Sequence, residues 1–402
     1  MKNGKVSIYN EYFFRDLSNY KLVWNLMQNG RKIQSGEVSD LNVAPQQKTV
    51  LTLPYKVPAT GEIMLNIEFK LKEAEPLMSA GQTVAYRQLA VREVAPTLPM
   101  MQGVKSKVKL KDDKKANAYR ISSKSNIDVV FDKTTGLLTK YNVDGKDLLG
   151  EGGTLRPNFW RAVTDNDMGA QLQKKFKAWR NPTMNLKTLS YQKMGKDAVR
   201  VIAKYDMPEV KSGLSLTYTV YGDGTMEVEQ SLNAMTKDKV EGLLRFGMRM
   251  DLPYKMDKSE FYGRGPIENY IDRKESQPVG IYAQTADQQF YPYIRPQETG
   301  TKSDLRWWRQ SANSTTGFNL NSDKLFSASA LHYSVDDLDE GDEKDQRHAT
   351  DLKKSKFTEL CFDLAQFGLA GENSWGAWPL PQHRLGYKDM TFRFRITPLS
   401  KR

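Results

Sequence analysis

The sequence has few of the residues that build metal sites and disulfide bonds. It contains one cysteine and three histidines in 402 residues. One cysteine excludes an internal disulfide, and this small set of Cys and His side chains cannot supply the ligand spacing of zinc motifs. Cys361 lies in an alternating apolar run, so we interpret it as a small buried side chain. We therefore expect neither metal ligands nor thiol chemistry in this chain.

Long apolar runs and nucleic-acid-binding motifs are also missing. No run of about 18 apolar residues occurs, so no membrane-spanning helix is expected. Residues 1–5 lack the apolar core of a signal peptide. The net charge is +12, but basic residues alternate with acids, as in residues 112–115, and no helix-turn-helix, RRM or basic-region pattern is present. We expect neither a membrane nor a nucleic acid as partner.

The dominant period of the hydrophobic pattern is two, which is typical of β-strands. Residues 63–71 alternate apolar and polar side chains, and Asn29-Gly30 between two such runs indicates a hairpin. The pattern predicts an all-β protein with an immunoglobulin-like β-sandwich of about seven strands at 1–97. A linker is expected at 98–118 and one large all-β domain at 119–402. Within that domain, the spacing of apolar residues predicts one short helix over about 170–180.

Two motifs combine acidic residues with tight turns. The first motif, residues 158–167, is Asn-Phe-Trp-Arg-Ala-Val-Thr-Asp-Asn-Asp; it lacks the ligand spacing of a Ca²⁺ loop, and we interpret it as a turn that caps a helix. The second motif, residues 262–273, contains Glu268 and Asp272. Two carboxylates are what glycoside hydrolysis requires, but closeness in sequence alone does not give the facing geometry, so we favour an ion-pair network with Arg273.

Two further motifs have the composition of a sugar site. The third motif, residues 291–300, mixes prolines, tyrosines and planar polar groups, and could also be a packed loop. The fourth motif, residues 367–379, surrounds Trp375 with small residues. An exposed tryptophan on a loop is usually there to bind a ligand, so we predict that Trp375 stacks on a sugar.

Taken together, these motifs carry a resemblance that covers nearly the whole chain. The sequence resembles the C-terminal two domains of bacterial β-galactosidases of glycoside hydrolase family 2. Residues 8–15 resemble the first strand of the family's fourth domain. The segments 159–167, 263–273, 291–300 and 371–375 resemble signatures of its fifth domain. The resemblance implies that the second domain is a galactose-mutarotase-like supersandwich.

The resemblance also implies what this chain lacks. The family's two catalytic glutamates and its Mg²⁺ and Na⁺ sites lie in an upstream TIM barrel, and no strand–helix alternation of that kind is present here. No catalytic residue and no cofactor are therefore expected in this chain, and the isolated chain is predicted to be inactive. Trp375 matches the tryptophan that contacts the aglycone sugar, and Asn373 is expected to assist it. Gly371-Glu372-Asn373 replaces a more aspartate-rich stretch, which puts the aglycone preference in doubt.

The implied function is therefore that of a β-galactosidase fragment that supplies one wall of a retaining enzyme's active site. Its implied partners are a β-galactoside or oligosaccharide, the missing barrel and the N-terminal domains, in a homo-oligomeric parent enzyme from the cytoplasm or periplasm. Two alternatives remain open. One is a free-standing aldose epimerase that would use His332 and Glu298 as acid and base. The other is a carbohydrate-binding module.

Overall fold

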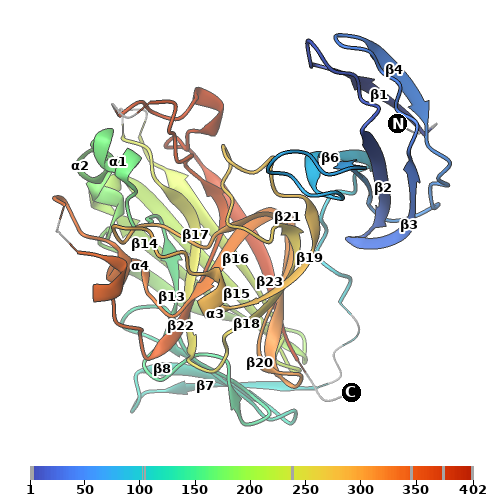
Figure 1. Cartoon of the computed structure of the whole chain (residues 1–402). Helices are drawn as coiled ribbons and strands as arrows, with labels where there is room; N and C mark the ends of the chain where they lie inside the picture. The colour runs from blue at the N-terminus through green and yellow to red at the C-terminus, as the bar shows by residue number, and fades with distance from the viewer. Residues whose placement is uncertain are drawn as a thin grey trace. The chain divides into compact units, whose positions relative to one another are not determined.

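The computed structural model describes residues 4–101, 103, 106–236, 240–344, 347–373 and 376–399. Two compact units form, and nearly all of the regular structure is β-strand (Figure 1), which confirms the predicted all-β class. The first unit is Met1–Ala95 with Pro278–Ile281, and the second is Pro96–Gln277 with Tyr282–Arg402. In the described part of the chain, no helix has the length and apolar character needed to cross a membrane.

The first unit is the predicted β-sandwich. Its strands pair in two antiparallel sheets, β1–β4 and β3–β2–β5–β6. Side chains from both sheets, among them Ile8, Trp24 and Ile67, form one core, because alternate residues of each strand point inward. The strands are β1 (Lys5–Tyr9), β2 (Tyr20–Gln28), β3 (Arg31–Val38), β4 (Lys48–Thr52), β5 (Ile63–Leu71) and β6 (Thr83–Arg92).

The first strand is shorter than residues 8–15, the range expected from the resemblance. β1 ends at Tyr9, and the side chain of Asn10 then binds the local backbone. Its Nδ2 donates to the carbonyl of Arg15 at 2.9 Å, and its Oδ1 accepts the N–H of Tyr12 at 3.1 Å. An asparagine that bonds neighbouring backbone groups competes with strand pairing, so the chain turns at this point.

The second unit is built on one large antiparallel sheet that closes on itself around an extended core, with a small separate cluster of Ala162, Leu331 and Leu338. Its strands are β7 (Val108–Asp113), β8 (Ala118–Ser123), β9 (Ile127–Asp132), β10 (Leu138–Val143), β11 (Lys146–Asp147), β12 (Leu155–Asn158), β13 (Asn185–Met194), β14 (Ala198–Met207), β15 (Ser212–Tyr221), β16 (Met226–Ala234), β17 (Arg245–Pro253), β18 (Lys258–Arg264), β19 (Val279–Thr285), β20 (Lys302–Asn313), β21 (Thr316–Leu331), β22 (Phe357–Gln366) and β23 (Met390–Pro398).

The basic stretch predicted as linker, 98–118, contains a strand. β7 pairs with β8, from Val108 opposite Ser123 to Asp113 opposite Ala118. Val108 and Leu110 pack against the core of the second unit, while Lys109 between them and Lys111 after them are exposed. Two apolar side chains two positions apart are enough for one half-buried face, and the lysine-rich composition concealed this alternation.

The helical segment expected at 170–180 is present but divided. Gln171 adopts a left-handed backbone conformation with φ 61°, which interrupts a continuous helix. Leu172, Phe176 and Trp179 are nevertheless each only 1% exposed, as their spacing predicted. The helices are α1 (Asp165–Gly169), α2 (Leu172–Lys175), η1 (Lys177–Trp179), η2 (Pro208–Val210), α3 (Ala286–Gln289), α4 (Val335–Leu338), η3 (Ala349–Asp351) and η4 (Pro381–His383).

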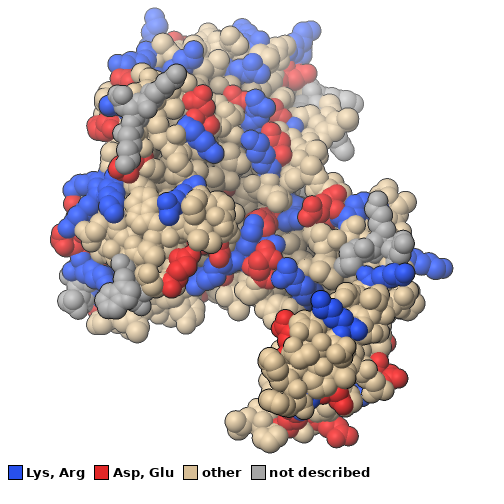
Figure 2. Space-filling model, turned by 90° about the horizontal axis from the view of Figure 1, so that it is seen from above, with Lys and Arg blue, Asp and Glu red and all other residues tan. Residues whose placement is uncertain are grey.

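The net positive charge is spread among acidic residues. On the face that Figure 2 shows, Lys and Arg side chains lie between Asp and Glu side chains. Exposed ion pairs in the described part of the chain include Arg120 with Asp128 and Arg393 with Glu229, both at 2.6 Å. This arrangement differs from the continuous basic stripe that is typical of nucleic-acid-binding surfaces.

Candidate functional site

The four motifs meet at one end of the second unit. In Figure 1, α1 and α2 lie at the same end as the red segment that follows β22. Arg161 of the first motif hydrogen-bonds to the backbone of Gly368 in the fourth, across 207 sequence positions. Since the motifs come from separate strand ends of one closed sheet, the fold itself brings them together.

Arg161 is the central anchor of this site. Its guanidinium forms a bidentate pair with Asp167, at 3.1 and 2.8 Å, and both residues are almost completely buried. The remaining donors reach the fourth motif: Nη1 donates to the carbonyl of Phe367, and Nη2 donates to that of Gly368 at 2.9 Å. A planar guanidinium can satisfy a carboxylate and two carbonyls at once, so Arg161 ties the base of the fourth motif to the first.

The rest of the first motif starts helix α1, as the turn interpretation predicted. Thr164 is the N-cap: its side chain accepts the N–H of Asp167, and the Asp167 carboxylate accepts the N–H of Thr164. This reciprocal capping box uses the carboxylate that a Ca²⁺ loop would need. The next residue inside the helix, Asn166, donates from Nδ2 to the carbonyl of Leu369 at 3.1 Å. Helix α1 therefore supplies a second tie to the fourth motif.

The second motif supports the same loop from another direction. Asp272 accepts the N–H of Ala370 at 2.9 Å. Gly368 lies so close that a Cβ added there would be 2.4 Å from an Asp272 oxygen. The expected ion pair between Glu268 and Arg273 is present at 2.9 Å, whereas Asp272 binds backbone rather than joining that pair.

Glu268 connects the second motif to the third. Its carboxylate accepts the N–H of Gly300 at 2.7 Å, the hydroxyl of Thr299 at 3.0 Å and the hydroxyl of Tyr293. With Arg273 as a fourth donor, the acceptor positions of this carboxylate are occupied. Glu268 is thus a structural acceptor in this chain, not a free acid or base.

The third motif in turn joins the first. Arg295 donates to Asp165 at 2.9 Å and to the carbonyl of Val163 at 3.0 Å, and Gln297 donates to Asp165 at 3.1 Å. Burial opposes ionisation of Asp165, but the hydrogen bonds from Arg295 and Gln297 outweigh it, so the pKa of this carboxyl lies below its ordinary value. The four motifs therefore form one connected polar network.

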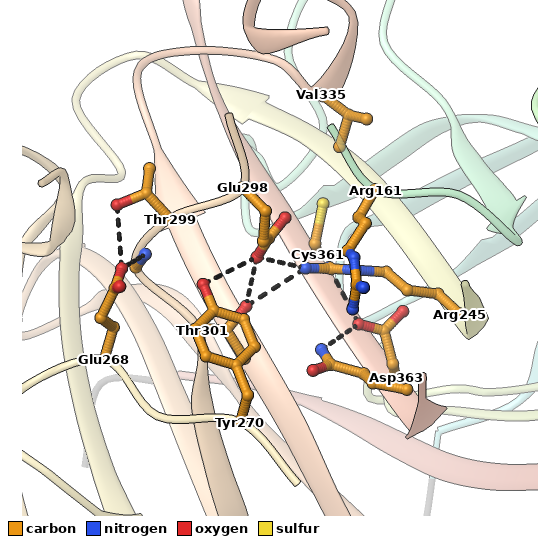
Figure 3. Close-up of polar contacts among 12 residues, drawn as sticks. Arg161, Arg245, Glu268, Tyr270, Glu298, Thr299, Thr301, Val335, Cys361 and Asp363 are labelled. Carbon is orange, nitrogen blue, oxygen red and sulfur yellow. Dashed lines mark hydrogen bonds and ion pairs between the residues drawn. The ribbon is translucent and has the colours of Figure 1, made fainter. Parts of the chain in front are cut away.

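A buried charged centre lies beside this network (Figure 3). The Arg245 guanidinium lies between Glu298 and Asp363, and the Arg245–Asp363 distance is 3.0 Å. Burial disfavours the charged form of Arg245, but the two carboxylates outweigh it and hold its pKa above the ordinary value. Burial raises the pKa of Asp363 to about 6, although the neighbouring Arg245 acts to lower it.

The structure gives His332 and Glu298 different sets of partners. Glu298 accepts from Arg245 and from the hydroxyl of Thr301, the latter at 2.8 Å. His332 is buried and stacks on Tyr254 with ring centroids 4.0 Å apart, and its Nδ1 lies 3.2 Å from the Thr358 hydroxyl. The contacts given for Glu298 and for His332 are thus with different residues. The contacts give no support to an acid–base pair made of these two residues.

The fourth motif carries the predicted sugar-binding residues. Asn373 is exposed, and its Oδ1 accepts the N–H of Ala377 at 3.3 Å. Trp375 lies outside the described residues. Beyond it, Gly376 has φ 82° and approaches Gly169 at the end of α1, where an added Cβ would be 2.3 Å from the Gly169 carbonyl oxygen. The motif is therefore held both before and after Trp375.

Comparison with known proteins agrees with this arrangement. The sequence model of the family described as "Beta galactosidase small chain" matches residues 123–396, and that of "Beta-galactosidase, domain 4" matches residues 6–92. The chain belongs to the β-galactosidase small chain family. The first match includes all four motifs of the second unit. The second match lies within the sandwich unit.

Curated relatives of this small chain are considerably longer. A β-galactosidase of Priestia megaterium is 32% identical over 98% of the chain, and one of Lactobacillus delbrueckii subsp. bulgaricus is 30% identical over 99%. The chain spans only 38% of the length of each.

Solved structures that match this small chain include a putative aldose 1-epimerase of Escherichia coli and a galactose 1-epimerase of Lactobacillus acidophilus. Each is 9% identical with a TM-score of 0.38. They cover 72% and 73% of this chain and 98% of their own chains. At that level the likeness carries no argument about activity.

Sequence reasoning missed the buried centre of the small chain. Arg245 was not singled out, although it stands in an apolar run between Leu244 and Phe246, where a basic residue needs a buried partner. Lys302 was missed too: its ammonium donates to the Gly300 carbonyl at 2.7 Å, and burial lowers its pKa to about 8. A charged residue at an inward position of a strand is the signal that would have found both.

Proposed function

We propose that this chain is the C-terminal part of a β-galactosidase and forms one wall of that enzyme's active site. Family membership and the β-galactosidase relatives support the assignment. In this proposal, Trp375 stacks on the aglycone sugar of a β-galactoside, and Asn373 hydrogen-bonds to a sugar hydroxyl. The observation that carries the proposal is the position of the fourth motif on both sides of Trp375: Arg161 binds its backbone before Trp375, and the backbone of Gly376 approaches Gly169 closely after it.

We propose further that the chain does not hydrolyse glycosides alone. Retaining hydrolysis needs two carboxylates about 5 Å apart that face the bond to be cut. Glu268 and Asp272 of the second motif and Glu298 of the third each accept hydrogen bonds from their surroundings. The catalytic carboxylates of the proposed enzyme therefore belong to its remaining part.

The metal ions of the proposed enzyme are assigned to that remaining part as well. The described residues contain no group of three or more His, Cys, Asp or Glu side chains that could hold a metal ion. Acids in the four motifs bind arginines and backbone N–H groups instead. Mg²⁺ and Na⁺ would act on the side of the active site that carries the catalytic carboxylates.

The proposal is tested by measuring hydrolysis of a chromogenic β-galactoside with Mg²⁺ and Na⁺ present. The chain alone, at high concentration, is expected to give no turnover above buffer. Co-expressed with the remaining part of the enzyme, it is expected to give an active complex. Turnover by the chain alone that survives repurification would contradict the proposal, and Glu268, Asp272 and Glu298 would then be the first residues to mutate.

A further inference from the structure

The third motif begins with an exposed apolar tip, residues 291–294. Tyr291 is 58% exposed and Ile294 is 83% exposed, and Pro292 between them is exposed as well. Single exposed apolar side chains are normal on a protein surface, but a group of them on one loop beside a functional site marks an interaction surface.

The tip is held rigidly although its side chains are exposed. Tyr293, inside the tip, donates its hydroxyl to the buried Glu268 carboxylate, which also accepts the N–H of Gly300 at 2.7 Å. Directly after the tip, Arg295 binds Asp165 at 2.9 Å. Ordering a loop on binding costs free energy, so a loop that is already ordered loses less when it meets a partner.

The apolar tip belongs to the same network as the sugar-binding loop. Arg295 at its end binds Asp165, the first residue of α1, and the next residue, Asn166, binds the carbonyl of Leu369. The tip and the fourth motif are therefore fixed relative to each other through α1. A partner that meets one of them lies within reach of the other.

We infer that the apolar tip docks on the catalytic part of the β-galactosidase, in an apolar recess beside the active site. The inference rests on the proposed function. The β-galactosidase relatives extend well beyond the matched region, which is 38% of their length, so the proposed partner is large. If Trp375 reaches an active site on that partner, the surface fixed next to the fourth motif faces the same partner. Tyr291 and Ile294 then act as anchors that exclude water from the contact.

The test is co-expression of the tagged chain with the rest of the parent enzyme as a second polypeptide. The amount retained on the tag, the Kd from serial dilution and the β-galactosidase activity are measured. Ile294→Asp places a charge in the proposed contact and is expected to weaken association by about tenfold or more. Since Ile294 is 83% exposed, the variant should keep the wild-type Tm. Tyr291→Asp is also expected to weaken association.

Met235→Asp is the matched control, because Met235 is 58% exposed in the same unit but lies after β16, outside the four motifs. It is expected to associate like the wild type. Equal association of the wild type, Ile294→Asp and Met235→Asp in an active complex would overturn the docking surface and leave the proposed function standing. A wild-type chain that retains no partner and restores no activity would overturn both.

Discussion

Arg161 shows how one side chain can hold a loop that it does not belong to. Its guanidinium neutralises Asp167 and binds the carbonyls of Phe367 and Gly368 in a site that water does not reach. A lysine would carry the same charge, but its single ammonium cannot match the planar carboxylate and the two carbonyls together. The loop geometry therefore depends on the shape of the arginine as well as on its charge.

Arg161→Met should destabilise the protein strongly. The change leaves the Asp167 carboxylate buried without its cation, which typically costs about 3 to 5 kcal/mol. Arg393→Met is the control: it breaks a pair with Glu229 in which the Arg393 side chain is 57% exposed, and about 1 kcal/mol or less is expected. Urea unfolding followed by tryptophan fluorescence measures both, and equal losses would contradict the anchoring role of Arg161.

Gly368→Ala tests how tightly the base of the fourth motif is packed. The added Cβ would lie 2.4 Å from Asp272, so the Asp272–Ala370 bond must shift, and a loss of about 1 to 3 kcal/mol is expected. Gly386→Ala makes the same chemical change where no atom lies within 4 Å, and should stay within about 0.5 kcal/mol of the wild type. If urea unfolding gave the two variants the same stability, the close approach would be unimportant.

At the level of secondary structure elements, the sequence predicted what depends on local pattern. Alternation indicated the strands, and the spacing of Leu172, Phe176 and Trp179 placed these side chains in the core. The pattern did not indicate β7, because four of its six residues are charged. It did not indicate the helix break either, because glutamine is not a residue that usually favours left-handed backbone.

The contacts within the candidate site could not be predicted in the same way. Each motif was recognisable, but the bond from Arg161 to Gly368 spans 207 positions and depends on the path of the whole sheet. The centre around Arg245 is a similar case: its partners, Glu298 and Asp363, come from a loop and from β22. The local sequence pattern cannot predict contacts between residues so far apart in the chain. The four motifs did, however, indicate where the site lies.

The paired strands β17 and β22 hold a carboxyl whose protonation should affect stability. Burial raises the pKa of Asp363 to about 6, above an unfolded value of about 3.9. The folded state then binds the proton more tightly, so the stabilisation is complete below about pH 4 and is lost as the pH rises through 6. The stability advantage of the wild type over Asp363→Asn should therefore shrink by about 2 to 3 kcal/mol between pH 4 and pH 7.

Urea unfolding at several pH values in this range measures that difference. Asp144→Asn, which removes an exposed carboxyl from the same unit, gives the baseline. A wild-type advantage that stays constant, or grows as the pH rises, would show that Asp363 is ionised in the folded protein throughout the range. In that case Asp363 and Glu298 would both be ionised beside the single positive charge of Arg245.

At the scale of the whole molecule, carboxylates join the four motifs and hold their loops in place. Asp167 binds Arg161, Glu268 accepts the Thr299 hydroxyl, and Asp272 accepts a backbone N–H group. Under the proposal that the catalytic carboxylates lie in the remaining part of the enzyme, this chain orients a binding loop. A mutation in the fourth motif should therefore affect substrate and acceptor binding in the assembled enzyme more than its chemical step.

Trp375→Ala in the full-length enzyme tests directly whether the fourth motif affects substrate and acceptor binding more than the chemical step. Loss of one aromatic–sugar stacking contact should raise the KM by about threefold to tenfold and reduce transfer to acceptor sugars, with little change in Tm. Tyr191→Ala removes a half-exposed aromatic ring from β13, outside the four motifs, and should leave KM and transfer unchanged. Initial rates with a chromogenic galactoside, with and without added acceptor, measure both quantities. Unchanged KM and unchanged transfer in Trp375→Ala would remove the aglycone role from this residue, because stacking that contributes binding energy cannot be lost without effect on either quantity.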